Sequence, residues 1–206
     1  MKLYLVRHGE TDLNKRHILQ GRTDSELNAY GRELAYLTAE GLKDVPFDIA
    51  FTSPLRRAKE TAQIILGERQ TPLVEELRIQ EIGFGDFEGL CYLREDGNIP
   101  DKTFLNFFEK PEAYRTPPNG ESLEAVIRRT GEFLNELLSA KEYDDKTILV
   151  STHGCALKAI LANVRQAPIA EFWGAGVHKN CAVSILETQG KAEKSVAILE
   201  EGIVFY

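Results

Sequence analysis

Short apolar runs alternate along the chain with stretches whose apolar residues recur at helical spacing. The apolar runs predict strands at residues 2–6, 48–53, 71–75, 146–152, 181–188 and 194–201. The helical spacing predicts helices at residues 28–42, 54–67, 120–140 and 155–164. Strands that alternate with helices are typical of an α/β fold. We therefore expect a three-layer sandwich with a mostly parallel central sheet and one antiparallel edge strand.

Two of the predicted helices carry recognisable end signals. Asn28 is suited to cap the helix that follows it, because asparagine is a favoured N-cap residue. The next helix is expected to hold Pro54 in its first turn and to end at Gly67. These signals agree with the helical spacing and place the helix ends close to the neighbouring strands.

The segment between residues 91 and 119 is the least regular part of the chain. It holds four prolines and one short aromatic piece, at residues 104–108. We expect a small helical insert that packs over the sheet, within one domain that spans residues 1–206. Long irregular segments are often lids or substrate loops, and a surface excursion without a role is the alternative.

The composition is that of an ordinary globular protein, with 43% hydrophobic and 28% charged residues among 206. No apolar run approaches the ~20 residues of a membrane-spanning helix, and the N-terminal run is too short for a signal peptide. Cys91, Cys155 and Cys181 are odd in number and widely spaced, which favours reduced thiols. We therefore expect a cytoplasmic protein without membrane contact.

The charge of the chain is unevenly distributed. The formal net charge of -7 argues against general nucleic-acid binding, which usually needs a basic face. The first 22 residues reverse this balance, with five basic residues against two acidic ones. This local excess of positive charge in an acidic protein indicates an anion pocket rather than a broad cationic surface.

Polar side chains follow three of the predicted strands. Arg7 and His8 come directly after the first strand, and His153 and Gly154 come directly after the fourth. Arg57 lies one helical turn beyond the second strand. In parallel α/β sheets, ligands bind outside the carboxyl ends of the strands. Each residue alone is more typical of a loop or a helix surface, whereas their joint placement indicates a site.

The residue types in this group suit a phosphate ester. Two guanidinium groups match phosphate oxygens, and a histidine held against the phosphate can attack phosphorus as a nucleophile. The departing alkoxide then needs a proton, and Glu81 is the best candidate acid because it lies between Ile79 and Ile82 before a glycine-rich turn. The alternative is a glutamate without a catalytic role, since the chain has 32 acidic residues.

Five motifs stand in order along the chain. They are LYLVRHGET (3–11), SPLRRAKETA (53–62), IQEIGFGDFEG (79–89), GES (120–122) and STHG (151–154). Together they resemble the histidine phosphatase superfamily, in its phosphoglycerate mutase-like branch, from about residue 2 to residue 186. The resemblance implies an enzyme that forms a phosphohistidine intermediate without a metal ion or cofactor.

The resemblance also implies a role for individual residues. His8 matches the nucleophile, and Glu81 matches the proton donor that would later help to activate water. The residues that match the phosphate and substrate pocket are Arg7, Asn14, Gln20, Gly21, Arg57, His153, Gly154 and Cys155. Among these, Gly154 and Cys155 would contribute backbone N–H groups to the phosphate.

Two alternatives inside the site can be weighed from the residues. His8, His153 and Glu81 could together suggest a zinc site, but two arginines beside them would repel a metal ion. The family pattern has the pocket arginine directly before an alanine, so the resemblance implies Arg57 rather than Arg56. The expected ligand is a small phosphorylated metabolite, and the sequence indicates neither which metabolite nor an oligomeric state.

The segment 91–119 bears on the choice between hydrolysis and phosphoryl exchange. Phosphoglycerate mutases resemble one another in a longer insert with a basic cluster for the substrate carboxylate and second phosphate. Here the charged residues are Arg94, Lys102, Lys110 and Arg115 against Glu95, Asp96, Asp101, Glu109 and Glu112, with no adjacent basic pair. We therefore expect a histidine acid-type phosphatase that hydrolyses small phosphate monoesters. The alternatives are a cofactor-dependent phosphoglycerate mutase and a non-catalytic module that binds a phosphorylated ligand.

Overall fold

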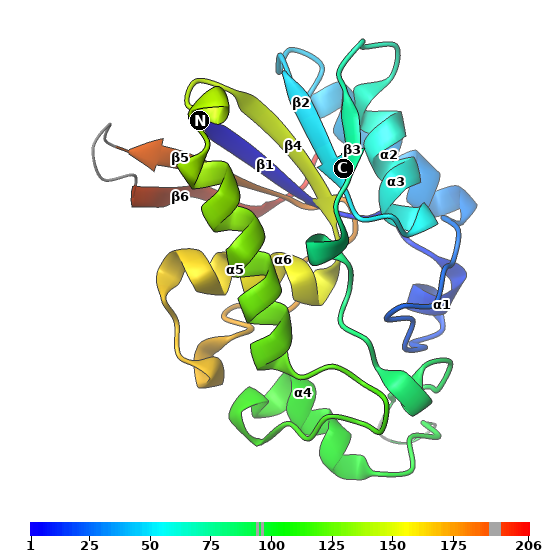
Figure 1. The fold of residues 1–206 in the computed structure, drawn as a ribbon. Coiled ribbons are helices and arrows are strands. Elements are labelled where there is room, and N and C mark those ends of the chain that lie inside the picture. Colours follow the sequence, from blue (N-terminus) through cyan, green and yellow to red (C-terminus); the bar gives the residue numbers. More distant parts are fainter. Residues whose placement is uncertain (94, 96, 190–194) are drawn as a thin grey trace.

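The computed structural model describes residues 1–93, 95, 97–189 and 195–206 of the chain. Within these residues, one central sheet holds six strands (Figure 1). The strands are β1 (Lys2–Arg7), β2 (Ile49–Thr52), β3 (Leu73–Glu75), β4 (Thr147–Thr152), β5 (Val183–Gln189) and β6 (Ser195–Ile203). Their order across the sheet is β3-β2-β4-β1-β5-β6, and β1 to β4 are parallel. The mostly parallel sheet is confirmed.

The antiparallel pairing predicted at one edge of the sheet is confirmed and involves two strands. β5 pairs antiparallel with β1, and β6 pairs antiparallel with β5. The strand that runs against the others is therefore β5, one place inside the edge, and β6 forms the edge itself. The reason is that consecutive strands can pair antiparallel without a crossover, which turns β6 back to the direction of β1.

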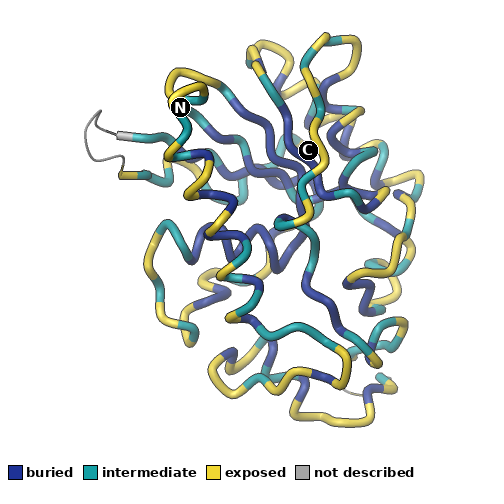
Figure 2. The backbone as a smooth tube through the Cα atoms, viewed as in Figure 1, coloured by how far each residue is buried: buried dark blue, intermediate teal, exposed yellow. Residues whose placement is uncertain are grey.

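Helices cover both faces of the sheet, so the predicted three-layer sandwich is confirmed (Figure 1). They are α1 (Asp12–Lys15), α2 (Ala29–Gly41), α3 (Arg56–Leu66), α4 (Asn106–Glu109), α5 (Leu123–Ser139) and α6 (Gly154–Arg165). Successive side chains of β1 point to opposite faces. Leu3 and Leu5 pack with Phe133 of α5, whereas Val6 packs with Ile65 of α3. Figure 2 shows β1 and β4 buried between the helices.

Two helix starts differ in how well their sequence signals predicted them. Asn28 caps α2 through its side-chain oxygen, as expected. Helix α3 begins at Arg56 with Leu55 as its N-cap, so Pro54 lies before the helix and not in its first turn. The Ser53 hydroxyl accepts the Leu55 N–H at 3.3 Å, which holds the chain in a turn at this point. Among the helices of the described residues, none is long and apolar enough to cross a membrane.

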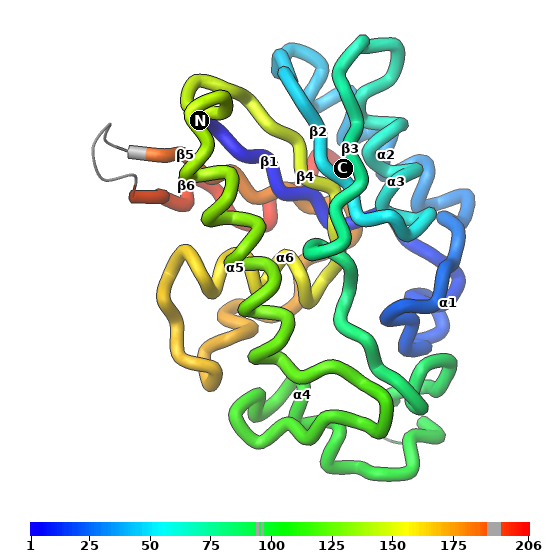
Figure 3. The backbone as a smooth tube through the Cα atoms, viewed as in Figure 1, coloured from blue at the N-terminus to red at the C-terminus, as the bar shows by residue number. Residues whose placement is uncertain are grey.

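The irregular segment after residue 91 is a small helical insert, as predicted. It holds α4 between two short 3₁₀ turns, Lys102–Leu105 and Pro111–Ala113. Phe104 and Phe107 are buried in a core cluster that also contains Trp173. Figure 3 shows the insert beside the start of α5 and away from the amino ends of the strands. The insert therefore lies on the side of the sheet where the parallel strands end.

Candidate active site

The fold brings the three predicted polar groups together at the carboxyl ends of the parallel strands. Arg7 at the end of β1 is paired with Thr152 at the end of β4, so His8 and His153 follow adjacent strands. The rings of these two histidines lie 5.1 Å apart, centroid to centroid. Arg57 reaches the same place from the first turn of α3. The joint placement predicted from the strand ends is confirmed.

A cavity of about 190 Å³ opens at these strand ends. We call its polar part the floor, which is lined by Arg7, His8, Asn14, Gln20, Gly21, Arg57, Glu81, Gly154 and Cys155. We call its apolar part the mouth, which is lined by Ile18, Leu19, Phe84, Tyr92, Phe107, Phe108, Trp173 and Val177. His153 does not line the cavity, because it is fully buried behind His8. The floor therefore holds every other residue predicted for the site.

His8 is held in the form that a nucleophile needs. Its Nδ1 lies 2.7 Å from the Gly9 carbonyl oxygen, which can only accept, so Nδ1 carries the proton. The lone pair is then on Nε2. Burial, together with the charges of Arg57 and Arg7, holds the pKa of His8 well below its usual value. At neutral pH the imidazole is therefore uncharged and available for attack through Nε2.

An unusual group of buried donors lies on the floor and on the His153 ring beside it. In the described parts of the chain, five buried side-chain nitrogen or oxygen atoms lack a hydrogen-bond partner, and one of them is the Tyr114 hydroxyl. The other four are Arg7 Nε, Gln20 Nε2, Arg57 Nε and His153 Nδ1. Buried donors are normally paired because an unpaired one costs free energy, about 1–3 kcal/mol each. Four such donors around one histidine indicate a site built to receive an anion.

Both guanidinium groups are held by main-chain carbonyls, Arg57 through both of its Nη atoms and Arg7 through Nη1. Arg57 Nη1 donates to the Thr23 carbonyl at 2.7 Å, and its Nη2 donates to the Gly21 carbonyl at 2.9 Å. Arg7 Nη1 donates to the His178 carbonyl. Burial lowers the pKa of Arg57 to about 10, so this side chain is still a cation at neutral pH. Each guanidinium group thus keeps its Nε–H for a ligand.

Ser53, which sequence reasoning missed, prepares His153 as a donor. The Ser53 hydroxyl lies 2.7 Å from His153 Nε2 and also accepts the Leu55 N–H. Its own proton is free to go to Nε2, which leaves the proton of the neutral imidazole on the unpaired Nδ1. Burial is the main cause that holds the pKa of His153 well below its usual value. The position of Ser53 directly after β2 was the signal that could have identified it.

The Glu81 carboxylate lies against the start of helix α6. Its oxygens accept N–H groups from Cys155 and Ala156, both at 3.1 Å, and from Ile82 at 3.0 Å. The first N–H groups of a helix have no partner within it, so they suit a carboxylate. In this structure the Cys155 N–H, predicted to bind phosphate, donates to Glu81 instead. The Gly154 N–H, predicted for the same role, has no partner within the described residues.

Gly154 lies close to both Arg7 and Glu81 on the floor. A methyl group on its Cα would lie 3.6 Å from Arg7 Nε and 3.7 Å from Glu81 Oε2. It would also lie 3.2 Å from a methyl group of Val177, which is closer than ordinary contact. The glycine predicted at this position thus leaves room for a ligand to approach both groups.

Asn14 belongs to the floor, and a second asparagine supports it. Asn14 Oδ1 accepts the Thr11 N–H at 3.2 Å and faces Asn180 Nδ2 at 3.5 Å. Asn180 Nδ2 also donates to the His8 carbonyl at 2.9 Å, which holds the main chain of the nucleophile. Sequence reasoning missed Asn180, because nothing in its local sequence connects it with His8.

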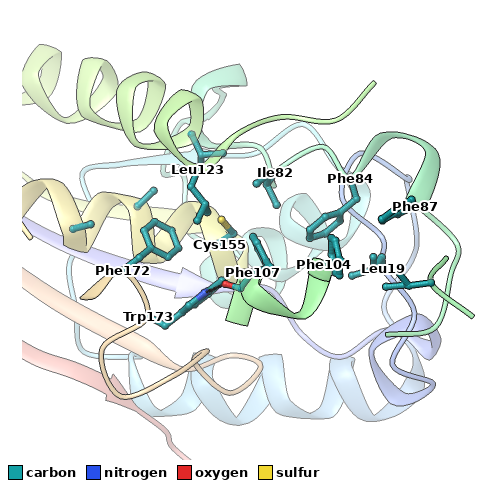
Figure 4. Close-up of a cluster of buried hydrophobic side chains, with 14 residues drawn as sticks. Leu19, Ile82, Phe84, Phe87, Phe104, Phe107, Leu123, Cys155, Phe172 and Trp173 are labelled. Atoms are coloured by element: carbon teal, nitrogen blue, oxygen red, sulfur yellow. Dashed lines mark hydrogen bonds between the residues drawn. The ribbon is translucent and has the colours of Figure 1, made fainter. Parts of the chain in front are cut away.

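The mouth is an extension of the aromatic core under the insert (Figure 4). Phe107 and Trp173 lie 5.1 Å apart, and the Trp173 indole N–H donates to the Phe107 carbonyl. Phe108 stacks obliquely on Tyr92 at 5.3 Å. Trp173 packs in this core and also faces the cavity, which the sequence pattern did not indicate.

Charged groups of the insert do not line the cavity where the structure describes them. Lys102, Lys110 and Arg115 are absent from its wall, and Arg94 and Asp96 lie outside the described residues. Among the described residues no group of three or more His, Cys, Asp or Glu side chains is arranged to hold a metal ion. The cationic side chains on the described wall of the cavity are therefore Arg7 and Arg57.

Comparison with known proteins agrees with this geometry. Residues 3–200 match the histidine phosphatase superfamily (branch 1), and the chain belongs to this family. It is 38% identical over 160 residues to an uncharacterized phosphatase PhoE of Bacillus subtilis, covering 78% of this chain and 75% of that protein. It is 34% identical over 166 residues to a 2,3-bisphosphoglycerate-dependent phosphoglycerate mutase of Beijerinckia indica, covering 77% and 78%.

A solved structure shows the same fold over nearly the whole chain. The structure of Bacillus stearothermophilus YhfR superposes with a TM-score of 0.89 at 32% sequence identity, and the match covers 98% of this chain and 97% of that one. The fold, the family and the site together define a histidine phosphatase superfamily enzyme, either a phosphatase or a phosphoglycerate mutase.

Proposed function

We propose that this protein is a phosphatase that hydrolyses small phosphate monoesters through a phosphohistidine on His8. The observation that carries the proposal is a set of four unpaired buried donors at an uncharged imidazole: three line the same cavity as His8, and the fourth is on the His153 ring, 5.1 Å from the His8 ring. Arg7, Arg57, Gln20 and His153 supply donors of the kind that bind phosphate oxygens, and two of them supply charge. A site that only binds an anion would not need an uncharged imidazole beside the anion.

The first half of the reaction forms the phosphoenzyme. The lone pair of His8 Nε2 attacks phosphorus, the new N–P bond forms, and the P–O bond to the leaving group breaks. The carboxyl group of Glu81 gives its proton to the departing oxygen, so the product leaves as an alcohol or phenol. The arginines and the Gly154 N–H stabilise the charge on the transferred phosphoryl oxygens.

The second half returns the enzyme to its starting state. A water molecule attacks phosphorus and passes one proton to the Glu81 carboxylate, which acts now as a base. The N–P bond breaks, and its electron pair returns to His8 Nε2. The products are inorganic phosphate, the uncharged imidazole and the protonated Glu81, so atoms and charges balance over the cycle.

The mouth favours hydrolysis over the mutase reaction. A mutase must hold a substrate that carries a carboxylate or a second phosphate, and both need further cations. Arg7 and Arg57 are engaged by the transferred phosphate, and the mouth, where the rest of the substrate would lie, is lined by apolar and aromatic side chains. Such a surface suits an ester whose leaving group is an aryl or other apolar group. We therefore propose small phosphorylated molecules with an apolar portion as substrates.

The mutase remains the second candidate because relatives of that name are 34% identical to this chain. The two are separated by comparing hydrolysis of an aryl phosphate with interconversion of 3-phosphoglycerate and 2-phosphoglycerate. We expect hydrolysis to be faster. Fast interconversion with negligible hydrolysis would reverse the assignment. A cytoplasmic location and an acid-type pH profile stay predictions within this proposal.

The phosphoenzyme gives the direct test. Rapid quench with a labelled aryl phosphate should trap a protein-bound phosphate that is labile in acid and stable in base, as a phosphohistidine is. His8→Ala should not form it and should lose at least about 10⁴-fold in kcat. His17→Ala is the matched control, because His17 is exposed and lies outside the floor. A phosphoenzyme that persists in His8→Ala would overturn the proposal.

A further inference from the structure

The main chain that carries Glu81 is held by side chains from other parts of the fold. Glu81 follows a short 3₁₀ turn and lies outside the helices and strands of the described chain. The Ile79 carbonyl accepts the Thr152 hydroxyl at 2.7 Å. The carbonyls of Arg78 and Gln80 each accept a hydrogen bond from Arg129 Nη1, both at 2.7 Å. Hydrogen bonds from side chains therefore take the place of the inter-strand hydrogen bonds that a β-strand would have made here.

Arg129, on α5, binds this segment with its whole guanidinium group. Besides the two carbonyls bound by Nη1, its Nη2 donates to the Glu81 carbonyl at 3.2 Å. Nη2 also donates to Glu121 Oε2 at 2.9 Å, and Nε donates to Glu121 Oε1 at 2.7 Å. The five N–H groups of a guanidinium thus have five acceptors. An ammonium group has three donors on one atom and cannot reproduce this pattern.

Glu121, the acidic residue of the GES motif, orients the Arg129 side chain toward the segment 78–81. The Glu121 and Arg129 side chains are 18% and 14% exposed, so the forked pair is largely shielded from water. The main chain of Glu121 also donates its N–H to the Gly83 carbonyl at 2.8 Å. Glu121 is therefore attached to the segment two residues beyond Glu81, while its carboxylate holds the arginine that binds the residues before it.

We propose that Arg129, aimed by Glu121, is a positioning residue for the general acid Glu81. The inference rests on the proposed function, in which Glu81 protonates the leaving group. The start of α6 holds the carboxylate of Glu81, and Arg129 holds its main chain, so both ends of the side chain are fixed. Without Arg129 the carboxyl group keeps its chemistry but loses its place relative to the departing oxygen.

The position of Arg129 separates this role from phosphate binding. Arg129 does not line the cavity, and its five hydrogen bonds go to Glu121 and to the segment 78–81. Arg7 and Arg57, which face the phosphate, are held by other carbonyls. The loss of Arg129 should therefore affect protonation of the leaving group more than affinity for phosphate.

The test compares two substrates of similar shape that differ in their need for a proton. Phenyl phosphate has a poor leaving group, and p-nitrophenyl phosphate has a good one. Arg129→Met should lower kcat/KM, which reports phosphorylation of the enzyme and not the later hydrolysis, by roughly 10- to 100-fold for phenyl phosphate and by at most about threefold for p-nitrophenyl phosphate. Inhibition by inorganic phosphate should stay within about twofold of the unmodified protein. Equal losses for both substrates would overturn the proposal.

Matched variants keep the test decisive. Arg128→Met removes the neighbouring arginine, which is exposed, and should change neither rate. Arg129→Lys should recover little of the rate for phenyl phosphate. Lysine keeps the positive charge but lacks the forked donor geometry of the guanidinium group. Should Arg129→Met fail to fold in a thermal unfolding scan, Glu121→Gln weakens the same fork and is expected to show the same selective loss at a smaller size. Equal losses in Glu121→Gln would overturn the proposal as well.

Glu81→Gln, measured in the same series, separates this inference from the proposed function. A selective loss for phenyl phosphate in Glu81→Gln but not in Arg129→Met would refute the positioning role and leave the acid in place. An absence of selective loss in Glu81→Gln itself would refute the acid assignment in the proposed function. Selective losses in both variants, with Glu81→Gln the larger at roughly 10²–10⁴-fold, are the expected result.

Discussion

The floor and the mouth of the cavity are built in different ways. The floor comes from residues that directly follow parallel strands or begin the next helix, such as His8 and Gly154, and its donors are pinned by main-chain carbonyls. The mouth comes from aromatic side chains of distant segments, such as Tyr92, Phe108 and Trp173. Under the proposed function, the floor would bind the phosphate of any ester, whereas the mouth would select the group attached to it. Chemistry and specificity would then reside in different parts of one cavity.

The largest effect on this comparison should come from the floor. Arg57→Lys keeps a positive charge but loses the forked geometry, and it leaves main-chain carbonyls of residues 20–23 with fewer donors. We expect kcat/KM to fall by roughly 10²–10³-fold for every phosphate ester, whatever its leaving group. Measurement of kcat/KM on aryl and alkyl phosphates checks this.

Arg56 is the matched control for Arg57, since the two are neighbours in sequence. Arg56 is exposed and pairs with Asp24 and Glu26 on the surface. Arg56→Lys should therefore leave kcat/KM within about twofold, because surface ion pairs contribute little. A large loss in Arg56→Lys with a small one in Arg57→Lys would show that the wrong arginine was assigned to the floor.

A smaller and selective effect is expected at the mouth. Phe108→Ala removes a half-buried ring that lines the cavity. We expect kcat/KM for naphthyl phosphate to fall about 10-fold, from the loss of roughly 1–2 kcal/mol of apolar contact, with little change for glycerol phosphate. Leu105→Ala, in the same insert but away from the cavity wall, is the control. Equal losses on both esters would remove the division between floor and mouth.

The pH dependence of kcat/KM should be set by groups of the floor and not by those of the mouth. A nucleophilic imidazole must be unprotonated, and burial with Arg57 and Arg7 holds the pKa of His8 well below 6.5. The acidic limb of the kcat/KM profile should therefore lie below pH 6.5, and it should be the same for aryl and alkyl phosphates. A profile with p-nitrophenyl phosphate and glycerol phosphate measures this. An acidic limb at or above pH 6.5 would contradict the neutral resting state of His8.

The smallest effect is on stability. His178 has its pKa lowered to about 4 from 6.5, chiefly by burial, so the folded protein resists protonation where the unfolded chain accepts it. Its contribution to stability is therefore complete above pH 6.5 and is lost as the pH falls from 6.5 toward about 4. Thermal unfolding over this range should show a decreasing Tm, and His178→Asn should show a weaker decrease. An equal fall of Tm with pH in both proteins would show that His178 is not the source of the decrease.

Much of the floor could be predicted because its geometry follows from chain direction. An apolar run that ends in Arg7 and His8 and another that ends in His153 must place these residues at one edge once the strands are parallel. The local sequence around Glu81 and the family resemblance for Asn14 added these two residues, and the structure has both on the floor. No packing detail was needed for this step, since it depends only on strand order and direction.

The partner of each polar atom could not be predicted in the same way. The Cys155 N–H was expected at the phosphate, yet it binds Glu81, because an acceptor from a distant segment reaches the helix start. Ser53 and Asn180 support His153 and His8 through hydrogen bonds that no local pattern indicates. Such pairings depend on how segments far apart in the chain approach one another.

The sequence by itself determined the class of fold and the family, and it identified the candidate nucleophile His8 together with most of the floor. These follow from short apolar runs and from residues next to them, where local chain geometry governs the result. Only the tertiary structure decided the aromatic mouth, the supporting Ser53 and Asn180, and the hold of Arg129 on the segment of Glu81. Each of these is a contact between distant segments, and the packing of the whole core sets which side chains meet.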